Sequence, residues 1–286
     1  MSPSPRSVTV FTHARPEQTG EPLRRVIELA GTAGVEVRVP EDEVEKHGIE
    51  PRDGVVLCAD PDGDTDLAVV LGGDGTILTT LRRFAGRRVL VFAVNFGTIG
   101  FLATVEPSQC DAGIEMALAG DLDVLELPGL LASTSNGDEL AINDISFHRR
   151  QTGRVAELAY SVEGEQLGEV RCDGLVAATP AGSTGYNLAN GGPVLAWGVE
   201  GYVVSFIAPH TLTARALVVA PDDVLTVTNR SHLEDVEMTT DGRPACLLPQ
   251  EESIDIRFEL RSALLAQLPG ASFYHRMRDK FGRLAY

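Results

Sequence analysis

The stretch from Asp66 to Phe84, DLAVVLGGDGTILTTLRRF, constrains the fold of this chain more than any other part of it. Residues 67–71 form a short, continuous apolar run rich in Val and Leu. Such a run is typical of a strand that is buried on both faces of a parallel sheet. Glycines at positions 72, 73 and 75 then break the run, and apolar residues recur after them at helical spacing. The stretch therefore predicts a strand, a glycine turn and a helix.

The glycine turn has the properties of a phosphate site, with one exception. A helix that starts there points its free N–H groups and the positive end of its dipole at the turn. The glycines let the backbone approach a ligand without a Cβ in the way. The exception is Asp74, whose charge repels phosphate. Two uses would justify it: holding a divalent cation, or accepting the proton of a hydroxyl that attacks a phosphoryl group. An ordinary turn with an exposed Asp also explains the local pattern.

Length, charge and cysteine pattern bound the class of protein. The 286 residues allow about two domains. A net charge of −17 argues against binding to nucleic acid, which requires a basic face. The four cysteines are scattered without metal-ligand spacing, no apolar run is long enough to span a membrane, and the N-terminus lacks a signal peptide. We therefore expect a cytoplasmic protein with no nucleic-acid or membrane partner.

The pattern of elements changes after about residue 120. Strands alternate with helices over residues 8–105, which predicts an open, doubly wound α/β domain. Short alternating segments punctuated by Gly, Asn and Asp follow, and they predict a β-rich, sandwich-like domain with a C-terminal helix at 273–281. The predicted boundaries are 1–120 for the α/β domain with the GGDG loop and 121–286 for the β-rich domain with its C-terminal helix.

A second unusual stretch, DGLVAATPAGSTGYNLANGGPVL, runs from Asp173 to Leu195. It predicts a buried strand followed by a loop of small residues that is rich in hydroxyl groups. Tyr186 stands among these small residues, which suits a stacking platform for a planar ring. Asn187 and Asn190 supply amide donors and acceptors. A pair of purely structural turns in a β domain remains an alternative reading.

With both stretches in view, the chain resembles the NAD kinases, which phosphorylate the adenosine-ribose 2′-hydroxyl of NAD. The motifs that carry the resemblance occur in the family's order: GGDGT at 72–76, NFGTIGFL at 95–102, AINDISFHR at 141–149, RCDGLVAATPAGSTGYNLANGGP at 171–193, PHTLTARALVV at 209–219 and DGR at 241–243. GGDG alone is weak, because lipid kinases and phosphofructokinases resemble it there. The combination at these spacings is specific.

The resemblance implies a role for each matching residue. Asp74 corresponds to the catalytic aspartate, Asn143 and Asp144 to the pair that holds adenine and the nicotinamide-side ribose, and Tyr186 to a residue that packs on the dinucleotide. The predicted substrate- and nucleotide-binding residues are Gly72, Gly73, Gly75, Thr76, Asn95, Asn143, Asp144, Arg154, Arg171, Asp173, Thr184, Gly185, Tyr186, Asn187, Leu188, Ala189 and Arg243. The metal ligands are not predicted.

The resemblance also implies partners: a divalent cation such as Mg²⁺, ATP or polyphosphate as phosphoryl donor, and assembly into a homodimer or homotetramer in which a neighbouring subunit often completes the NAD site. Some positions depart from the family's loop, where Ala181 and Ala189 replace hydroxyl residues and Gly185 replaces Ala. Two other functions stay open at this point. One is a GGDG-type lipid kinase, and the other is a catalytically silent regulator that binds a dinucleotide.

Overall fold

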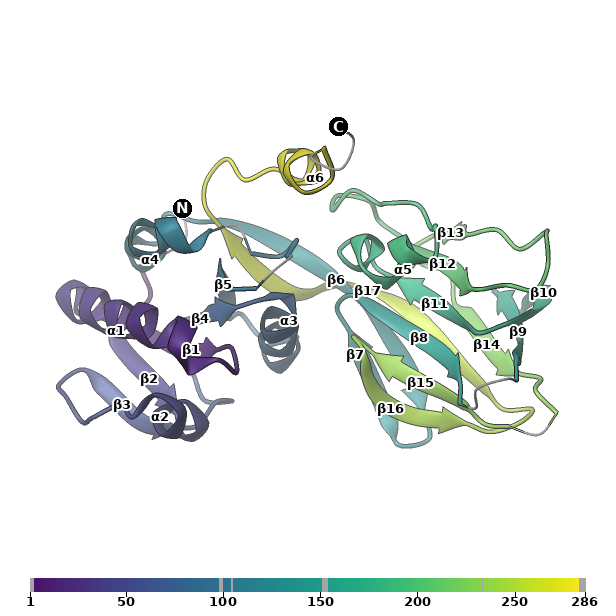
Figure 1. The fold of residues 1–286 in the computed structure, drawn as a ribbon, viewed down its shortest axis with the longest axis horizontal. Helices are drawn as coiled ribbons and strands as arrows, with labels where there is room; N and C mark the ends of the chain where they lie inside the picture. The colour runs from purple at the N-terminus through teal and green to yellow at the C-terminus, as the bar shows by residue number, and fades with distance from the viewer. Residues whose placement is uncertain (1–2, 98–99, 104, 151–153, 233, 283–286) are drawn as a thin grey trace. The chain divides into compact units, whose positions relative to one another are not determined.

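The computed structural model describes residues 3–97, 100–103, 105–150, 154–232 and 234–282. The chain divides into two compact units, one formed by residues 1–126 together with 263–286 and the other by residues 127–262 (Figure 1). Thr98 and Ile99, which belong to the second family motif, lie outside the described residues. Among the described residues, none of the helices combines the length and the apolar character that crossing a bilayer requires.

The first unit is built on a parallel sheet. Its strands are β1 (Ser7–Thr12), β2 (Glu36–Pro40), β3 (Val55–Ala59), β4 (Leu67–Gly72) and β5 (Leu90–Asn95), and they pair in the order β5-β4-β1-β2-β3. Every pair in this series is parallel. All six residues of β4 are buried, as the continuous apolar run predicts. The carboxyl ends of β1, β4 and β5 therefore lie at one edge, where open α/β sheets bind ligands.

Helices cover both faces of this sheet. α1 (Pro16–Ala33) and α4 (Cys110–Ala119) pack with Val8 and Val10 of β1 in one core cluster. On the other face Phe11 contacts Phe84, the residue that ends α3 (Asp74–Arg83), with ring centroids 6.0 Å apart. Neighbouring strand residues point to opposite faces, so the predicted doubly wound architecture is confirmed. The remaining helices are α2 (Glu41–His47), the short η1 (Pro107–Gln109) and α6 (Phe273–Phe281).

The second unit is a β-sandwich. One sheet has the order β13-β12-β11-β8-β15-β16, and the other contains the series β10-β9-β14-β17, with β6 and β7 attached to it. A single apolar cluster joins them, with Phe147 and Tyr202 from the first sheet against Leu225 and Ile256 from the second. The strands are β6 (Asp123–Thr134), β7 (Gly137–Ala141), β8 (Asp144–Arg149), β9 (Ala156–Val162), β10 (Glu165–Cys172), β11 (Gly174–Ala178), β12 (Tyr202–Ile207), β13 (Leu217–Val219), β14 (Leu225–Asn229), β15 (Val236–Thr240), β16 (Arg243–Leu248) and β17 (Ser253–Gln267), and two short helices, η2 (Gly182–Thr184) and α5 (Tyr186–Ala189), follow β11.

The C-terminal segment belongs to the α/β unit, which differs from the predicted division at residue 120. Residues 264–266 of β17 pair in parallel with β5. α6 then contacts the same unit, because Arg276 donates to the carbonyl of Leu102 at 3.1 Å and the rings of Phe101 and Phe281 lie 5.2 Å apart. Contacts between residues so distant in sequence leave no local pattern, so the prediction assigned the helix to the domain that precedes it along the chain.

Candidate active site

The GGDG motif forms the end of β4 and the first turn of α3. Gly72 is the last residue of β4, and Asp74 is the first residue of α3. Asp74 thus starts the helix instead of standing in a loop before it. The backbone of Gly97 packs on Gly73 so closely that a Cβ at position 97 would lie 2.9 Å from the Gly73 Cα. The two glycine-bearing segments that were predicted separately are therefore in contact.

Backbone amides hold the Asp74 carboxyl group. The N–H of Phe101 donates to Oδ2 at 2.9 Å, and the N–H of Leu102 donates to Oδ1 at 3.3 Å. A Cβ at Gly100 would lie 2.7 Å from Oδ1, so only glycine fits there. Burial raises the pKa of Asp74, whereas the two amides and the positive charges of Arg276 and Lys280 act in the opposite direction. The result is an oriented carboxylate of increased basicity at the carboxyl edge of the sheet.

Two further predicted residues support this turn. The Asn95 side chain accepts a hydrogen bond from the Gly97 N–H at 3.1 Å, which shapes the segment that contacts Gly73. Thr76 packs on Gly72, where a Cβ would lie 2.8 Å from its Oγ1. Gly75 is exposed at the start of α3. The exposed backbone at Gly75 is therefore the part of this turn that an anionic ligand can approach.

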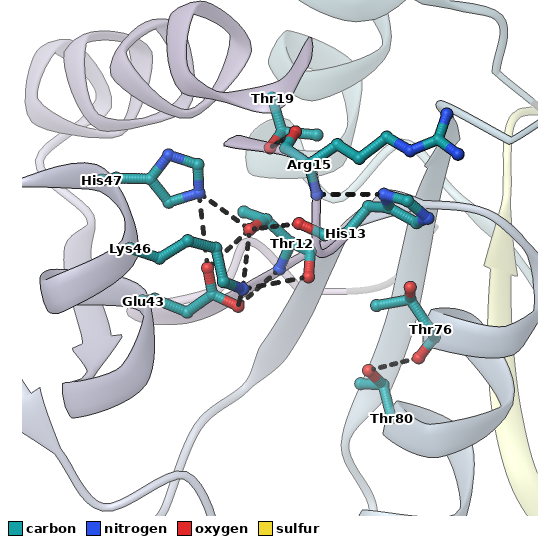
Figure 2. Close-up of polar contacts among 9 residues, drawn as sticks. All are labelled: Thr12, His13, Arg15, Thr19, Glu43, Lys46, His47, Thr76 and Thr80. Carbon is teal, nitrogen blue, oxygen red and sulfur yellow. Dashed lines mark hydrogen bonds and ion pairs between the residues drawn. The ribbon is translucent and has the colours of Figure 1, made fainter. Parts of the chain in front are cut away.

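A buried polar cluster fixes the end of β1, the strand next to β4 (Figure 2). Glu43 of α2 is 2% exposed and accepts the Thr12 N–H at 2.8 Å and the Thr12 hydroxyl at 2.6 Å. Lys46 pairs with the same carboxylate at 2.8 Å, and His47 Nε2 lies 2.8 Å from the Thr12 hydroxyl oxygen. Burial lowers the pKa of His47. The cluster therefore anchors the end of β1, where His13 begins the loop beside the GGDG turn. The N–H of His13 donates to the carbonyl of Leu71 in β4.

In the second unit, Asp241 holds the predicted Asn143-Asp144 pair. Its Oδ1 accepts the N–H of Asn143 at 2.7 Å and that of Asp144 at 3.2 Å, and its Oδ2 accepts the N–H of Ile142 at 3.1 Å. Asp241 lies in the turn between β15 and β16, with a φ of 47°. One carboxylate thus accepts hydrogen bonds from three successive backbone amides. It thereby fixes the backbone from which the Asn143 and Asp144 side chains project.

The loop after β11 forms hydrogen bonds with the backbone of residues 142–143. Thr179 donates its hydroxyl to the carbonyl of Ile142 at 2.7 Å and its N–H to that of Asn143 at 2.9 Å. Gly182 lies against Asn143, and a Cβ at position 182 would lie 2.0 Å from the Asn143 carbonyl oxygen. The sequence predicted the small residues of this loop to accommodate a ligand. In the structure, Gly182 must be glycine because the Asn143 backbone occupies the space that a side chain would need.

Asn143 and Asp144 both have unusual environments. Burial raises the pKa of Asp144 to about 7, and the charge of Asp241 adds to this increase. Asp144 is 7% exposed. The Oδ1 atom of Asn143 is buried and has no hydrogen-bond partner among the described residues. An unsatisfied buried acceptor is costly, so a donor group of a ligand would be favoured there.

Tyr186 forms part of a stacked aromatic pair. Its ring lies 5.6 Å from that of His148, with an interplanar angle of 14°. Burial lowers the pKa of His148, whose Nε2 lies 2.8 Å from the Ser146 hydroxyl. Tyr186 is 36% exposed. Part of its ring is therefore accessible, while His148 supports another part.

Asn187 has a different environment from the one predicted. Its side chain is fully buried, and its Nδ2 donates at 2.9 Å to the carbonyls of both Ser183 and Pro193. The Thr184 hydroxyl donates to the carbonyl of Ala181 at 3.1 Å. Leu188 and Ala189 complete the short helix α5. The side-chain donors of Thr184 and Asn187 thus form hydrogen bonds within the loop. The role of this segment in ligand binding stays a prediction.

Two of the predicted arginines, Arg154 and Arg171, lie at the other end of β8. There Arg149 pairs with Asp173 at 2.9 Å, and β11 begins opposite His148. Arg154 and Arg171 line a pocket of about 450 Å³ together with His210 and His232, and each arginine pairs with a glutamate at 3.0 Å. Asp144 and Arg149 are the two ends of β8 and are five residues apart, which is roughly 17 Å in a strand. Arg243 begins β16 next to the Asp241 turn.

Sequence reasoning did not single out two residues that shape these sites. Asp241 was noted only as part of the DGR motif. A DG pair between two strands is a turn signal, but it does not reveal which amides the carboxylate will accept. Arg276 was noted only as part of the amphipathic C-terminal helix. Its burial, at 8% exposure, marks it as exceptional among arginines, and burial is visible only in the folded chain.

Comparisons with known proteins agree on one family. The family model described as the ATP-NAD kinase N-terminal domain matches residues 10–122, and that of the ATP-NAD kinase C-terminal domain matches residues 142–267. The NAD kinase of Gemmatimonas aurantiaca is 34% identical over 228 residues, which cover 77% of this chain and 78% of the relative. The NAD kinase of Bifidobacterium longum strain NCC 2705 is 31% identical over 287 residues, covering 96% and 81%.

Solved structures show the same fold. A crystal structure of yeast NADH kinase complexed with NADH superimposes with a TM-score of 0.85 at 24% identity, covering 98% of this chain and 87% of that one. A structure of an NAD kinase from Archaeoglobus fulgidus in complex with ATP gives a TM-score of 0.73 at 24% identity and covers 98% of both chains. The α/β unit followed by a β-rich unit is thus an architecture shared with these proteins.

Proposed function

The chain belongs to the NAD kinase family, and we propose that it transfers the terminal phosphoryl group of ATP to the adenosine-ribose 2′-hydroxyl of NAD. The observation that carries the proposal is the environment of Asp74. Asp74 is the first residue of α3. Two backbone amides orient its carboxylate, and burial raises its pKa. A base of this kind suits the removal of a proton from an attacking hydroxyl.

Asp74 accepts the proton of the 2′-hydroxyl as the oxygen attacks the terminal phosphorus, and the bond from this phosphorus to the bridging oxygen breaks so that ADP leaves. The exposed backbone at Gly75 and the N-terminal end of α3 stabilise the negative charge that moves with the phosphoryl group. Each carboxylate oxygen accepts one backbone N–H, and a carboxylate has further lone pairs for the hydroxyl proton.

Asn143 and Asp144 bind the NAD molecule. The unsatisfied Asn143 Oδ1 would accept the exocyclic amine of adenine, and the Asp144 carboxylate would accept ribose hydroxyl groups. Tyr186 packs on a planar ring with its accessible part. An analogue that leaves these polar groups unpaired binds less well, so the site favours the dinucleotide over other alcohols.

A divalent cation would bind together with the phosphate groups of the donor. Among the described residues, no three His, Cys, Asp or Glu side chains are arranged to hold a metal ion. This fits Mg²⁺, which commonly binds through substrate phosphates and water with few protein ligands. When bound, the cation neutralises charge on the phosphate groups.

The function is tested by supplying NAD together with ATP or polyphosphate, with and without Mg²⁺, and measuring NADP. We expect product with ATP and Mg²⁺. Diacylglycerol in place of NAD tests the lipid-kinase alternative, and we expect that no phosphorylated lipid forms. If the purified chain binds NAD but forms no NADP with either donor, it is a silent dinucleotide-binding regulator instead.

We also propose that the functional form is a homodimer or homotetramer in the cytoplasm, in which the Arg154–Arg171 pocket serves an NAD molecule bound by a second copy. The support is the position of this pocket at the opposite end of β8 from Asp144. The test is complementation. Asp144→Asn and Arg171→Ala are each expected to be weak alone, whereas a mixed assembly regains activity at the one site that combines both native residues. If mixing restores nothing, both residues act within one copy.

A further inference from the structure

The peptide segment that orients Asp74 is bound on both of its polar sides. The N–H groups of Phe101 and Leu102 donate to the Asp74 carboxylate. The carbonyl groups of the same two residues accept hydrogen bonds from a single atom, Nη1 of Arg276. Asp74 and Arg276 are thus connected through the peptide unit between Phe101 and Leu102, whose N–H donates to the carboxylate and whose carbonyl accepts from the guanidinium.

Arg276 reaches this position from the last helix of the chain. It is 8% exposed, and burial lowers its pKa to about 10, which leaves the guanidinium charged at neutral pH. Removing such a charge from water is costly unless hydrogen bonds compensate. The contact between Phe101 and Phe281, with ring centroids 5.2 Å apart, holds α6 against the same segment. This placement therefore indicates a specific task for Arg276.

The segment leaves little freedom for Asp74 to move independently. A Cβ at Gly100 would lie 2.7 Å from the Asp74 Oδ1, so backbone and carboxylate are already in close contact. A displacement of residues 100–102 would move both N–H donors relative to the carboxylate. Arg276 fixes the segment from its other side and so determines where those donors point.

We propose that Arg276 is a positioning residue for phosphoryl transfer, which acts on Asp74 through the peptide groups of Phe101 and Leu102. This inference rests on the proposed role of Asp74 as the base. Arg276 contacts neither hydroxyl nor phosphate in this role. It keeps the two amides directed at the carboxylate, and it adds a positive charge near it. Lys280 on the same helix adds a second positive charge, which is partly offset by Glu106 at 3.8 Å.

The first test compares Arg276→Met and Arg276→Lys with Arg278→Met as control. Arg278 lies on the same helix, and its side chain is 70% exposed. We expect Arg276→Met to lower kcat by about 100-fold, the effect of a small misplacement of a catalytic group, while KM for NAD changes little. Arg276→Lys should retain more activity because it keeps a charged donor. Arg278→Met should behave like the wild type.

A second test separates positioning from a merely structural role. A pocket of about 580 Å³ is lined by Arg276, and it gives guanidinium ions a route to the space left in Arg276→Ala. Millimolar guanidinium should restore part of kcat in that variant and none in Arg278→Ala. The acid limb of the kcat profile should move to higher pH in Arg276→Met, since loss of the positive charge favours protonated Asp74.

A third measurement requires no activity. Amide hydrogen exchange at Phe101 and Leu102 should accelerate at least tenfold in Arg276→Met relative to the wild type, with exchange in β4 unchanged. Unchanged exchange at both amides, or equal losses in kcat for the Arg276 and Arg278 variants, would overturn the inference. A wild-type chain that makes no NADP would instead refute the proposed function, and the exchange experiment would still decide whether Arg276 holds the segment.

Discussion

Asp241 accepts the Asp144 N–H at 3.2 Å, at a position where burial raises the pKa of Asp144 and the charge of Asp241 raises it further. The same carboxylate thus fixes the backbone of Asn143 and Asp144, the pair proposed to bind NAD, and makes its acidic member easier to protonate. Burial is the larger cause, and the combined effect places the pKa of Asp144 at about 7. Protonation of Asp144 therefore occurs within the physiological range.

Binding of NAD should depend on pH through Asp144. Below about pH 7 the carboxyl group becomes protonated and loses acceptor capacity toward ribose hydroxyls. We expect KM for NAD to rise as the pH falls through 7, and we expect Asp144→Asn to have a high KM that varies little with pH. Steady-state kinetics from pH 5.5 to 8.5 measure both. A wild-type KM that stays flat across this range would contradict the assignment.

The same pKa makes a prediction for stability. The unfolded carboxyl has an ordinary pKa of 3.8 and the folded one a pKa of about 7, so the folded state binds more protons between these values. The free energy of unfolding then falls as pH rises from about 4 to 7. Asp144→Asn lacks the titrating carboxyl group, so its free energy of unfolding should not fall with pH in this way. The variant should therefore be more stable than the wild type at pH 8, by roughly 2–4 kcal/mol, and should show no such increase in stability at pH 4. Denaturant unfolding at both pH values tests this.

Asp74→Asn should separate binding from turnover. Asn keeps an oxygen that accepts an N–H from Phe101 or Leu102, but it cannot accept the hydroxyl proton. We expect kcat to fall by about 10³-fold, within the range for a positioned acid–base group, and the dissociation constant for NAD to stay within about threefold of the wild type. Single-turnover kinetics and calorimetric titration with NAD give the two values. Near-normal turnover would show that another group is the base.

The sequence was most informative where structure is local. The strand β4 and the helix α3 follow from a continuous apolar run and from helical spacing. Local rules also misplace boundaries: the apolar spacing of residues 22–30 indicates a helix that begins at Pro22, whereas α1 begins at Pro16 and carries Pro22 inside it. Pro is favoured in the first turn of a helix, and the pattern alone did not identify which of the two prolines begins it.

The residues that hold the sites could not be found in this way. Asp241 acts on Asn143 from 98 positions away, and Arg276 acts on Phe101 from 175 positions away. Such contacts depend on how strands pair and where the last helix packs, and periodicity carries no information about either. The family resemblance identified Asn143 and Asp144 by their motif, but it gave no reason for their geometry.

Gly182 should be irreplaceable because of Asn143, not because of a ligand. A Cβ there would lie 2.0 Å from the Asn143 carbonyl oxygen, so Gly182→Ala must displace either the loop or Asn143 and Asp144, the pair proposed to bind NAD. We expect a loss of about 1–3 kcal/mol in stability and a clearly raised KM for NAD. Gly198→Ala is the matched control, since nothing lies within 4 Å of a Cβ at that position. If both variants bind NAD equally well, the loop is less rigid than its contacts indicate.

Glu43 should determine the stability of the α/β unit. Its buried carboxylate accepts two hydrogen bonds from Thr12 and pairs with Lys46 (Figure 2). Glu43→Ala would leave the buried Thr12 N–H without its acceptor and Lys46 without its partner, and breaking such a buried pair costs about 3–5 kcal/mol. Glu45→Ala, an exposed position on the same helix, serves as control and should change stability by less than about 0.5 kcal/mol. Chemical denaturation measures both variants. Because the cluster anchors the strand beside the GGDG turn, Glu43→Ala should also raise KM for ATP more than KM for NAD, and the reverse order would place its effect elsewhere.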